Sequence, residues 1–213
     1  MLRTVRIALA LVFFTGITLL FLDFSGSLHA WLGWMARAQF LPALLAMNVA
    51  VLLIWVVLTL VFGRVYCSVI CPMGVMQDII AWLGKRKKHR RYGFSKEKRV
   101  LRWAFFAAAC MAWIAGVASF MALLAPYSSY GRMVQNLFQP LYLGINNVLA
   151  LGAEHVNSYA FYSKDVWIRS LPTFIIAVVT FITVAFLAWR NGRTYCNTVC
   201  PVGTILSVLA RFS

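Results

Sequence analysis

Acidic side chains and histidines are scarce in this chain of 213 residues. It has five Asp and Glu residues against 20 Lys and Arg, and only three histidines. General acid–base catalysis needs carboxylates or imidazoles placed near one another. The sequence shows no acid–base dyad, no pairing of a nucleophile with a base and no phosphate-binding loop. It therefore does not indicate an enzyme in its own right.

Charged residues of either sign are also few. They make up 12% of the chain against 62% hydrophobic residues, and the mean hydropathy is +0.82. A soluble domain of this length cannot bury so much apolar surface, so the composition predicts an integral membrane protein. Ten of the basic residues lie in the block 85–102. Such a block beside hydrophobic runs is typical of a cytoplasmic anchor, and a nucleic acid is not expected as a partner because no basic face is interleaved with stacking aromatics.

Four apolar segments are long enough to cross a membrane: 5–22, 41–62, 101–124 and 171–189. At ~1.5 Å per residue the second reaches ~33 Å, enough for a hydrocarbon core of ~30 Å. An alternative for the first segment is a signal peptide, because Arg3 and Arg6 precede it. Its apolar run is longer than the ~7–15 residues of a signal core, which favours a membrane span.

The basic residues are divided unequally between the two sides of such a bundle. With four spans and both termini inside, the inner segments carry 16 of the 20 Lys and Arg. The outer segments carry Arg37, Arg132, Lys164 and Arg169. The positive-inside rule then predicts that both termini are cytoplasmic.

One phrase with two cysteines occurs twice. Residues 63–74 read GRVYCSVICPMG and residues 192–203 read GRTYCNTVCPVG, so seven of twelve positions are identical. The four cysteines are Cys67, Cys71, Cys196 and Cys200, and each pair recurs at an offset of 129 residues. In the predicted topology both copies face the reducing cytoplasm, where a structural disulfide is a poor explanation.

The recurrence divides the chain into two halves of one plan. Residues 1–84 form a first repeat, 85–102 a basic cytoplasmic loop, and 101–213 a second repeat with an outer segment at 125–170. We therefore predict an all-α polytopic membrane protein whose four transmembrane helices form two parallel repeats. Each repeat ends in a C-x-x-x-C-P motif and a short interfacial helix. Parallel repeats can be related by an axis along the membrane normal, which would bring the motifs together.

A fifth crossing is the main alternative to this topology. Residues 133–152 are fairly apolar, but Gln, Asn and Pro side chains interrupt the run. We expect this segment to be a helix on the outer surface. If it crossed the membrane, the two motifs would face opposite sides.

Thiolates bind iron–sulfur clusters, zinc and copper, and C-x-x-x-C-P is also the closing string of a bacterial ferredoxin run. Each copy offers two ligands, so a four-ligand site needs both. Arg64 and Arg193 lie three residues before the first cysteine of each pair. A cation there favours thiolates and offsets the negative charge of a cluster. A basic residue at this position would equally fix the membrane topology. Cys110, in the third span, is expected to be a packing residue.

At the level of these motifs the chain resembles the membrane-bound 4Fe-4S ferredoxin-like (polyferredoxin) family. That family includes the quinol-oxidising membrane subunit of periplasmic nitrate reductase, the regulatory membrane protein of nitrous-oxide respiration and an oxidase-assembly factor. The shared phrase is G-R-x-Y/F-C-x-x-x-C-P-x-G after a membrane helix. The resemblance implies an iron–sulfur protein of a bacterial inner membrane, with the four motif cysteines as its functional cysteines.

Many members continue into a cytoplasmic ferredoxin domain, whereas this sequence stops at Ser213. Either a partner supplies those ligands, or the site differs, or the chain is a fragment of a longer product. The leading hypothesis is an electron-transfer subunit that passes electrons between a quinone or a cytoplasmic carrier and a partner redox system. The alternatives are a metal-handling or oxidase-assembly factor that binds copper or iron through the same thiolates, and a purely structural anchor.

Overall fold

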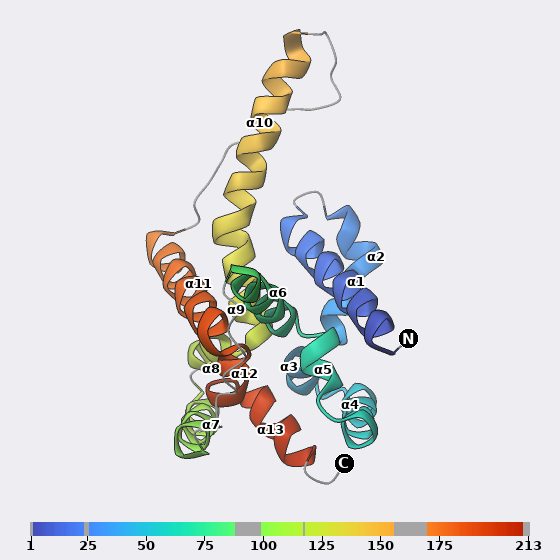
Figure 1. Ribbon diagram of the computed structural model, residues 1–213. Helices are drawn as coiled ribbons and strands as arrows, with labels where there is room; N and C mark the ends of the chain where they lie inside the picture. Colours follow the sequence, from blue (N-terminus) through green and yellow to red (C-terminus); the bar gives the residue numbers. More distant parts are fainter. Residues whose placement is uncertain (1, 24–25, 88–98, 117, 156–169, 211–213) are drawn as a thin grey trace.

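The computed structural model describes residues 2–23, 26–87, 99–116, 118–155 and 170–210. Within these ranges every regular element is helical, as the sequence predicts (Figure 1). The elements of the first half are α1 (Leu2–Leu22), α2 (Ser27–Arg37), α3 (Phe40–Leu45), α4 (Val49–Phe62), α5 (Val65–Val69) and α6 (Pro72–Lys87). Those of the second half are α7 (Arg99–Ile114), α8 (Ala118–Leu124), α9 (Pro126–Met133), the π-helical turn η1 (Val134–Phe138), α10 (Gln139–His155), α11 (Leu171–Asn191), α12 (Thr194–Thr198) and α13 (Pro201–Leu209).

Two helices are long and apolar enough to cross a membrane. They are Thr4–Leu22 in α1 and Leu171–Asn191 in α11, and less than a quarter of each span is buried inside the protein. The 21 residues of α11 correspond to ~32 Å, which matches the ~30 Å of a bilayer core. A core helix of a soluble protein would be mostly buried, so the exposed apolar surface of α1 and α11 suggests contact with lipid.

The second and third predicted spans are not continuous helices. Segment 41–62 divides into α3 and α4 at Met47, which has a positive φ of 52°. Asn48 then caps α4, because its side chain accepts a hydrogen bond from the backbone N–H of Val51. Asn48 therefore lies at the break between α3 and α4, outside both helices. The 14 residues of α4 reach only ~21 Å.

Segment 101–124 is interrupted in the same way. It contains α7 and α8, and α7 is followed by a turn in which Gly116 has φ 74°. The 16 residues of α7 correspond to ~24 Å. Among the described residues there are therefore two helices of spanning length and two shorter apolar helices, Val49–Phe62 and Val100–Ile114, where we expected four transmembrane helices. The topology with four spans stays a prediction.

The segment that we expected on the outer surface is helical. It runs through η1 into α10, which projects away from the rest of the molecule (Figure 1). Pro140 lacks an N–H and its ring crowds the preceding turn, which accounts for a π-helical turn at this point. The amide of Asn136 donates to the backbone oxygen of Arg132 at 2.8 Å. Much of the outer segment, residues 156–169, lies outside the described residues.

The core lies around α6, which packs against α1, α9 and α11 (Figure 1). Its fully buried apolar side chains include Ile17, Met73, Met133 and Leu206, contributed by four different helices. Each such burial contributes roughly 1.5–3 kcal/mol. We expected α6 and α13 to lie on the membrane interface, but their first two turns pack inside the protein. Both helices begin at a proline, as predicted, because a missing N–H costs nothing in the first turn.

Candidate metal centre

The two cysteine motifs adopt the same backbone conformation. Gly63 has φ 67° and ψ −143°, and Gly192 has φ 73° and ψ −129°. Residues other than glycine avoid this combination of φ and ψ, which explains why both copies begin with glycine. In each copy the glycine carbonyl accepts a hydrogen bond at 2.8 Å from the amide two residues later, Val65 or Thr194. This tight turn separates the long helix from the short helix that carries the first cysteine.

A second shared feature fixes the position of the other cysteine. The amide of Cys71 donates to the carbonyl of Tyr66 at 3.0 Å, and the amide of Cys200 donates to that of Tyr195 at 3.2 Å. The Cys200 sulfur in turn accepts the backbone N–H of Gly203 at 3.3 Å. These bonds hold each second cysteine at the start of α6 or α13.

The last residue of each motif is glycine because a backbone carbonyl occupies the place of a side chain. A Cβ atom on Gly74 would lie 2.1 Å from the Cys67 oxygen, and one on Gly203 would lie 2.2 Å from the Cys196 oxygen. Real Cβ atoms do not approach this closely, so the two glycines allow each second helix to pack on the first cysteine. The C-P-x-G string is therefore a packing signature in both copies.

Side chains from each half reach the motif of the other half. Arg64 donates from Nη1 to Oδ1 of Asn197 at 2.8 Å. Arg193 forms a bidentate ion pair with Asp78, in which Nε lies 2.6 Å from Oδ1 and Nη2 contacts Oδ2. These contacts place the two motifs side by side, as the parallel-repeat hypothesis requires. Neither arginine contact was predicted from the sequence.

The four motif cysteines are buried, with at most 6% of each exposed. The pKa of the Cys67 thiol is raised to about 12. Burial is the largest cause and the charge of Cys196 the second, and both outweigh the lowering effects of Arg193 and Arg64. Burial and Cys196 also raise the pKa values of Cys71 and Cys200 well above the ordinary range. The sulfurs of both copies therefore belong to one electrostatic environment. A metal that bound them would displace protons.

The thiol of Cys196 has a partner of its own. Gln77 in α6 donates from Nε2 to the Cys196 sulfur at 3.3 Å, and this hydrogen bond lowers the pKa that burial raises. This contact of Gln77 was not predicted from the sequence. The signal that could have revealed it is the alignment of the two repeats, which places an apolar residue, Leu206, at the matching position.

Burial of Arg193 and the negative charge of Asp78 act in opposite directions on the pKa of the arginine. Burial alone would lower the pKa of its guanidinium, but the hydrogen bond and charge of Asp78 outweigh this and raise it. Arg193 therefore keeps its positive charge beside the thiols. Since 30% of the Arg193 side chain and 43% of that of Asp78 are exposed, water screens much of the attraction between them.

The motif tyrosines join each motif to a neighbouring helix. Tyr66 donates to Oε1 of Gln39 at 2.8 Å and accepts from the amide of Phe40 at 3.0 Å. Tyr195 donates to the carbonyl of Leu124 at 3.1 Å. Both rings are buried, and the Tyr66 hydroxyl ties its motif to the start of α3, whereas the Tyr195 hydroxyl ties its motif to the end of α8. Cys110 is half-buried in α7 and is not among the charges that shift the motif thiols.

The chemistry of the donor set, four cysteine sulfurs, suits an iron–sulfur cluster. Among the described residues, no three His, Cys, Asp or Glu side chains are grouped closely enough to hold one metal ion. Zinc needs sulfurs about 4 Å apart, given Zn–S bonds of ~2.3 Å. Four soft sulfur donors, with N–H groups and two arginines nearby, are the kinds of group that thiolate-bound clusters use.

Comparison with known proteins leads to the same cofactor. Residues 44–91 and 171–213 match a family model described as "4Fe-4S binding domain", and each stretch contains one cysteine motif. The chain is 23% identical over 188 residues to the methylamine utilization ferredoxin-type protein MauN of Paracoccus denitrificans. No solved structure matches the chain.

The match to MauN covers 86% of this chain and 50% of the relative, so the chain spans about half of the relative's length. Together the two matches support membership of a ferredoxin-like 4Fe-4S family, as the motifs suggested. They also support an iron–sulfur cluster as the cofactor.

Proposed function

We propose that this chain is a membrane electron-transfer protein that holds one 4Fe-4S cluster between its two C-x-x-x-C-P motifs. The ligands would be Cys67, Cys71, Cys196 and Cys200. The observation that carries this proposal is the side-by-side packing of the two motifs, in which four buried thiols influence one another. A bound cluster would supply one-electron redox chemistry at this position.

The remaining groups of the site would control charge and solvent. A thiolate-bound cluster is negatively charged, and its potential depends on burial, hydrogen bonds to sulfur and nearby charge. Arg64 and Arg193 lie where they would offset that charge, and Gln77 and Gly203 direct N–H groups to sulfur. The buried core around α6 would exclude water from the site.

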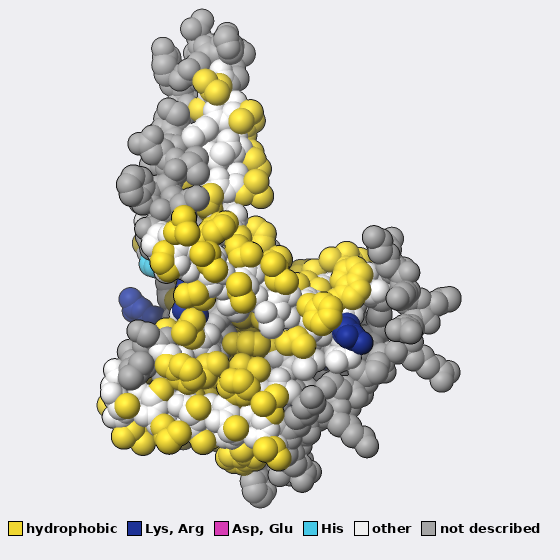
Figure 2. Space-filling model, turned by 90° about the vertical axis from the view of Figure 1, so that its left-hand side faces the viewer, with side chains coloured by type: hydrophobic (Ala, Val, Ile, Leu, Met, Phe, Trp, Pro, Cys, Tyr) yellow, Lys and Arg dark blue, Asp and Glu magenta, His cyan; other side chains and the backbone are white. Residues whose placement is uncertain are grey.

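The membrane topology is part of the proposal. We propose a multi-pass protein of a bacterial inner membrane, with both termini and both motifs on the cytoplasmic side. Exposed apolar side chains support membrane contact, and they spread over the face shown in Figure 2, where few basic side chains appear. Reporter fusions after Leu83 and after Ser213 should both report cytoplasm. A periplasmic signal from the second alone would mean that segment 133–152 crosses the membrane.

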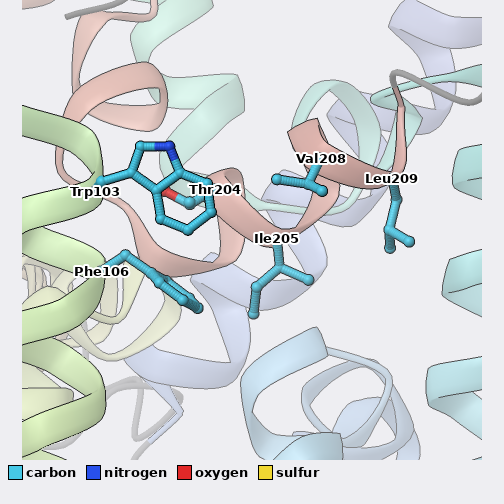
Figure 3. A pocket seen from close by; sticks show the side chains of 6 residues that line it. All are labelled: Trp103, Phe106, Thr204, Ile205, Val208 and Leu209. Carbon is cyan, nitrogen blue, oxygen red and sulfur yellow. The ribbon is translucent and has the colours of Figure 1, made fainter. Parts of the chain in front are cut away.

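A quinone is one candidate electron partner. A pocket of about 250 Å³ lies between α7 and α13, next to the second motif (Figure 3). Its apolar walls include Trp103, Phe106 and Ile205. The volume is below the ~300–1,000 Å³ of typical ligand sites, so it would admit a ring or part of a tail. The second candidate is a cytoplasmic redox protein that docks on the basic block 85–102, most of which lies outside the described residues.

Anaerobic purification of the full chain provides the decisive experiment. We expect a brown protein with iron and acid-labile sulfide in equal amounts, and an EPR signal after reduction. Cys67→Ala and Cys196→Ala should each lower the bound iron almost as far as the double variant, because a site with three ligands is incomplete. Cys110→Ala is the matched control and should retain full iron.

The same measurement distinguishes electron transfer from the alternative function, metal handling or oxidase assembly. A colourless protein with stoichiometric copper or zinc and no sulfide would favour a metal-handling or oxidase-assembly factor. If Cys67→Ala and Cys196→Ala both kept full metal and an unchanged spectrum, the shared site would be wrong and the cysteines would be packing residues.

A further inference from the structure

A glutamine side chain is completely buried beside the thiols. Gln77 has no exposed surface, and its amide nitrogen lies 3.3 Å from both the Met73 carbonyl and the Cys196 sulfur. Its oxygen, Oε1, is buried and has no hydrogen-bond partner. Burying an amide oxygen without a partner opposes folding, so the stability of the fold does not explain this residue.

Another buried glutamine shows what a structural role looks like. Gln39 also has no exposed surface, but both ends of its amide are paired. Its nitrogen donates to the Ile70 carbonyl at 3.1 Å, and its oxygen accepts from the Tyr66 hydroxyl at 2.8 Å. Gln39 thereby joins α2 and α3 to the first motif. Gln77 has no such complete set of bonds.

The second repeat shows that the position itself does not require an amide. The offset of 129 residues that relates the motifs places Leu206 at the position of Gln77. Leu206 is equally buried, so an apolar side chain satisfies the packing there. The next residue differs too: Asp78 pairs with Arg193, whereas Ser207 bonds to the Thr204 carbonyl of its own helix. The two halves therefore surround the thiols with unlike groups.

We propose that Gln77 is a positioning residue that directs an N–H group at the Cys196 sulfur and thereby raises the reduction potential of the bound cluster. The proposal rests on the function proposed above. An N–H group that faces a ligating sulfur withdraws negative charge, and this favours the reduced, more electron-rich state.

The test replaces the amide with apolar side chains of similar size. Gln77→Met keeps the length of the side chain, and Gln77→Leu copies the residue of the second repeat. Each variant is purified anaerobically as the full chain, and iron, sulfide, the thermal midpoint and the potential from an EPR-monitored redox titration are measured. Gln39→Met is the matched control, because it removes a buried amide that does not touch sulfur.

We expect both Gln77 variants to retain iron and sulfide and to keep or raise the thermal midpoint, since an unpaired buried oxygen is removed. In these variants the equilibrium constant for reduction of the cluster should fall by up to about tenfold. For a one-electron couple this corresponds to a shift of about 59 mV toward negative potential. Gln39→Met should show the reverse: a lower thermal midpoint and an unchanged potential. A purely structural glutamine at position 77 would not move the potential.

The outcomes separate this inference from the proposed function. A wild-type protein without iron and sulfide would overturn the proposed function, and the role of Gln77 with it. A wild-type cluster whose potential stays the same in Gln77→Met and Gln77→Leu would overturn the inference alone. If both variants failed to fold, Gln77 would be a structural residue and the inference would again be wrong.

Discussion

Gly74→Ala tests whether packing between the first cysteine and the second helix shapes the site. The added Cβ would lie 2.1 Å from the Cys67 carbonyl oxygen, and real contacts of this kind are not shorter than 3.0 Å, so about 0.9 Å must be relieved. The neighbouring atom belongs to the backbone and cannot turn aside. The change therefore has to displace the segment that carries the Cys67 thiol.

The magnitude follows from two opposing contributions. Overpacking of this kind costs typically 1–3 kcal/mol, and a clash with backbone belongs at the upper end. Alanine regains up to about 1 kcal/mol of helix preference over glycine. The net loss of about 1–2 kcal/mol corresponds to a lower thermal midpoint of roughly 2–8 °C for a chain of this size. Bound iron should fall as well, because Cys67 moves.

Thermal unfolding in detergent and iron per chain are the two measurements. Gly203→Ala should behave in the same way, since its Cβ would lie 2.2 Å from the Cys196 oxygen. Gly144→Ala, within α10, is the control, because nothing lies within 4 Å of its added Cβ, and it should be neutral or stabilising. Equal iron and an equal midpoint in Gly74→Ala and the wild type would refute the packing argument.

Four further predictions follow from the site. Arg193→Ala should shift the reduction potential downward, because a positive charge beside Cys196 and Cys67 is removed, and an EPR-monitored titration measures this shift. Asp78→Asn should lower the free energy of unfolding by less than about 1 kcal/mol, since the ion pair between Asp78 and Arg193 is partly exposed. Reconstitution of metal-free protein with iron and sulfide should be more complete at pH 9 than at pH 7, because burial raises the pKa of Cys67 to about 12 and loading must displace that proton; an equal yield at both pH values would contradict this. Tyr66→Phe should lower the thermal midpoint more than Tyr195→Phe, because it leaves Oε1 of Gln39 and the amide of Phe40 without their bonds, at about 1–3 kcal/mol each.

The local form of each motif could be read from the sequence because it depends on residues with special backbone requirements. Proline 72 and proline 201 start helices in both copies, and the glycines at 74 and 203 permit close packing. These effects act within about ten residues. A repeated string of glycine, cysteine and proline therefore predicts a repeated backbone.

The breaks within the second and third apolar segments were not predicted, because hydropathy reports composition and not backbone conformation. Met47 adopts a positive φ at this turn, and methionine rarely does so, so the local sequence does not indicate a turn here. Asn48 was a readable signal, since asparagine is a preferred helix N-cap, but its position inside an apolar run concealed that role. The turn at Gly116 could have been read from the glycine itself.

The sequence by itself determined the helical class, the apolar character, the two motifs and the candidate cysteines, because each follows from composition or from contacts between near neighbours. Only the tertiary structure decided which groups surround the thiols. The contacts of Gln77 with Cys196, of Asp78 with Arg193 and of Arg64 with Asn197 join residues 119, 115 and 133 positions apart. Such contacts depend on how α6, α11 and α12 pack, and the pattern of either repeat alone does not encode that packing.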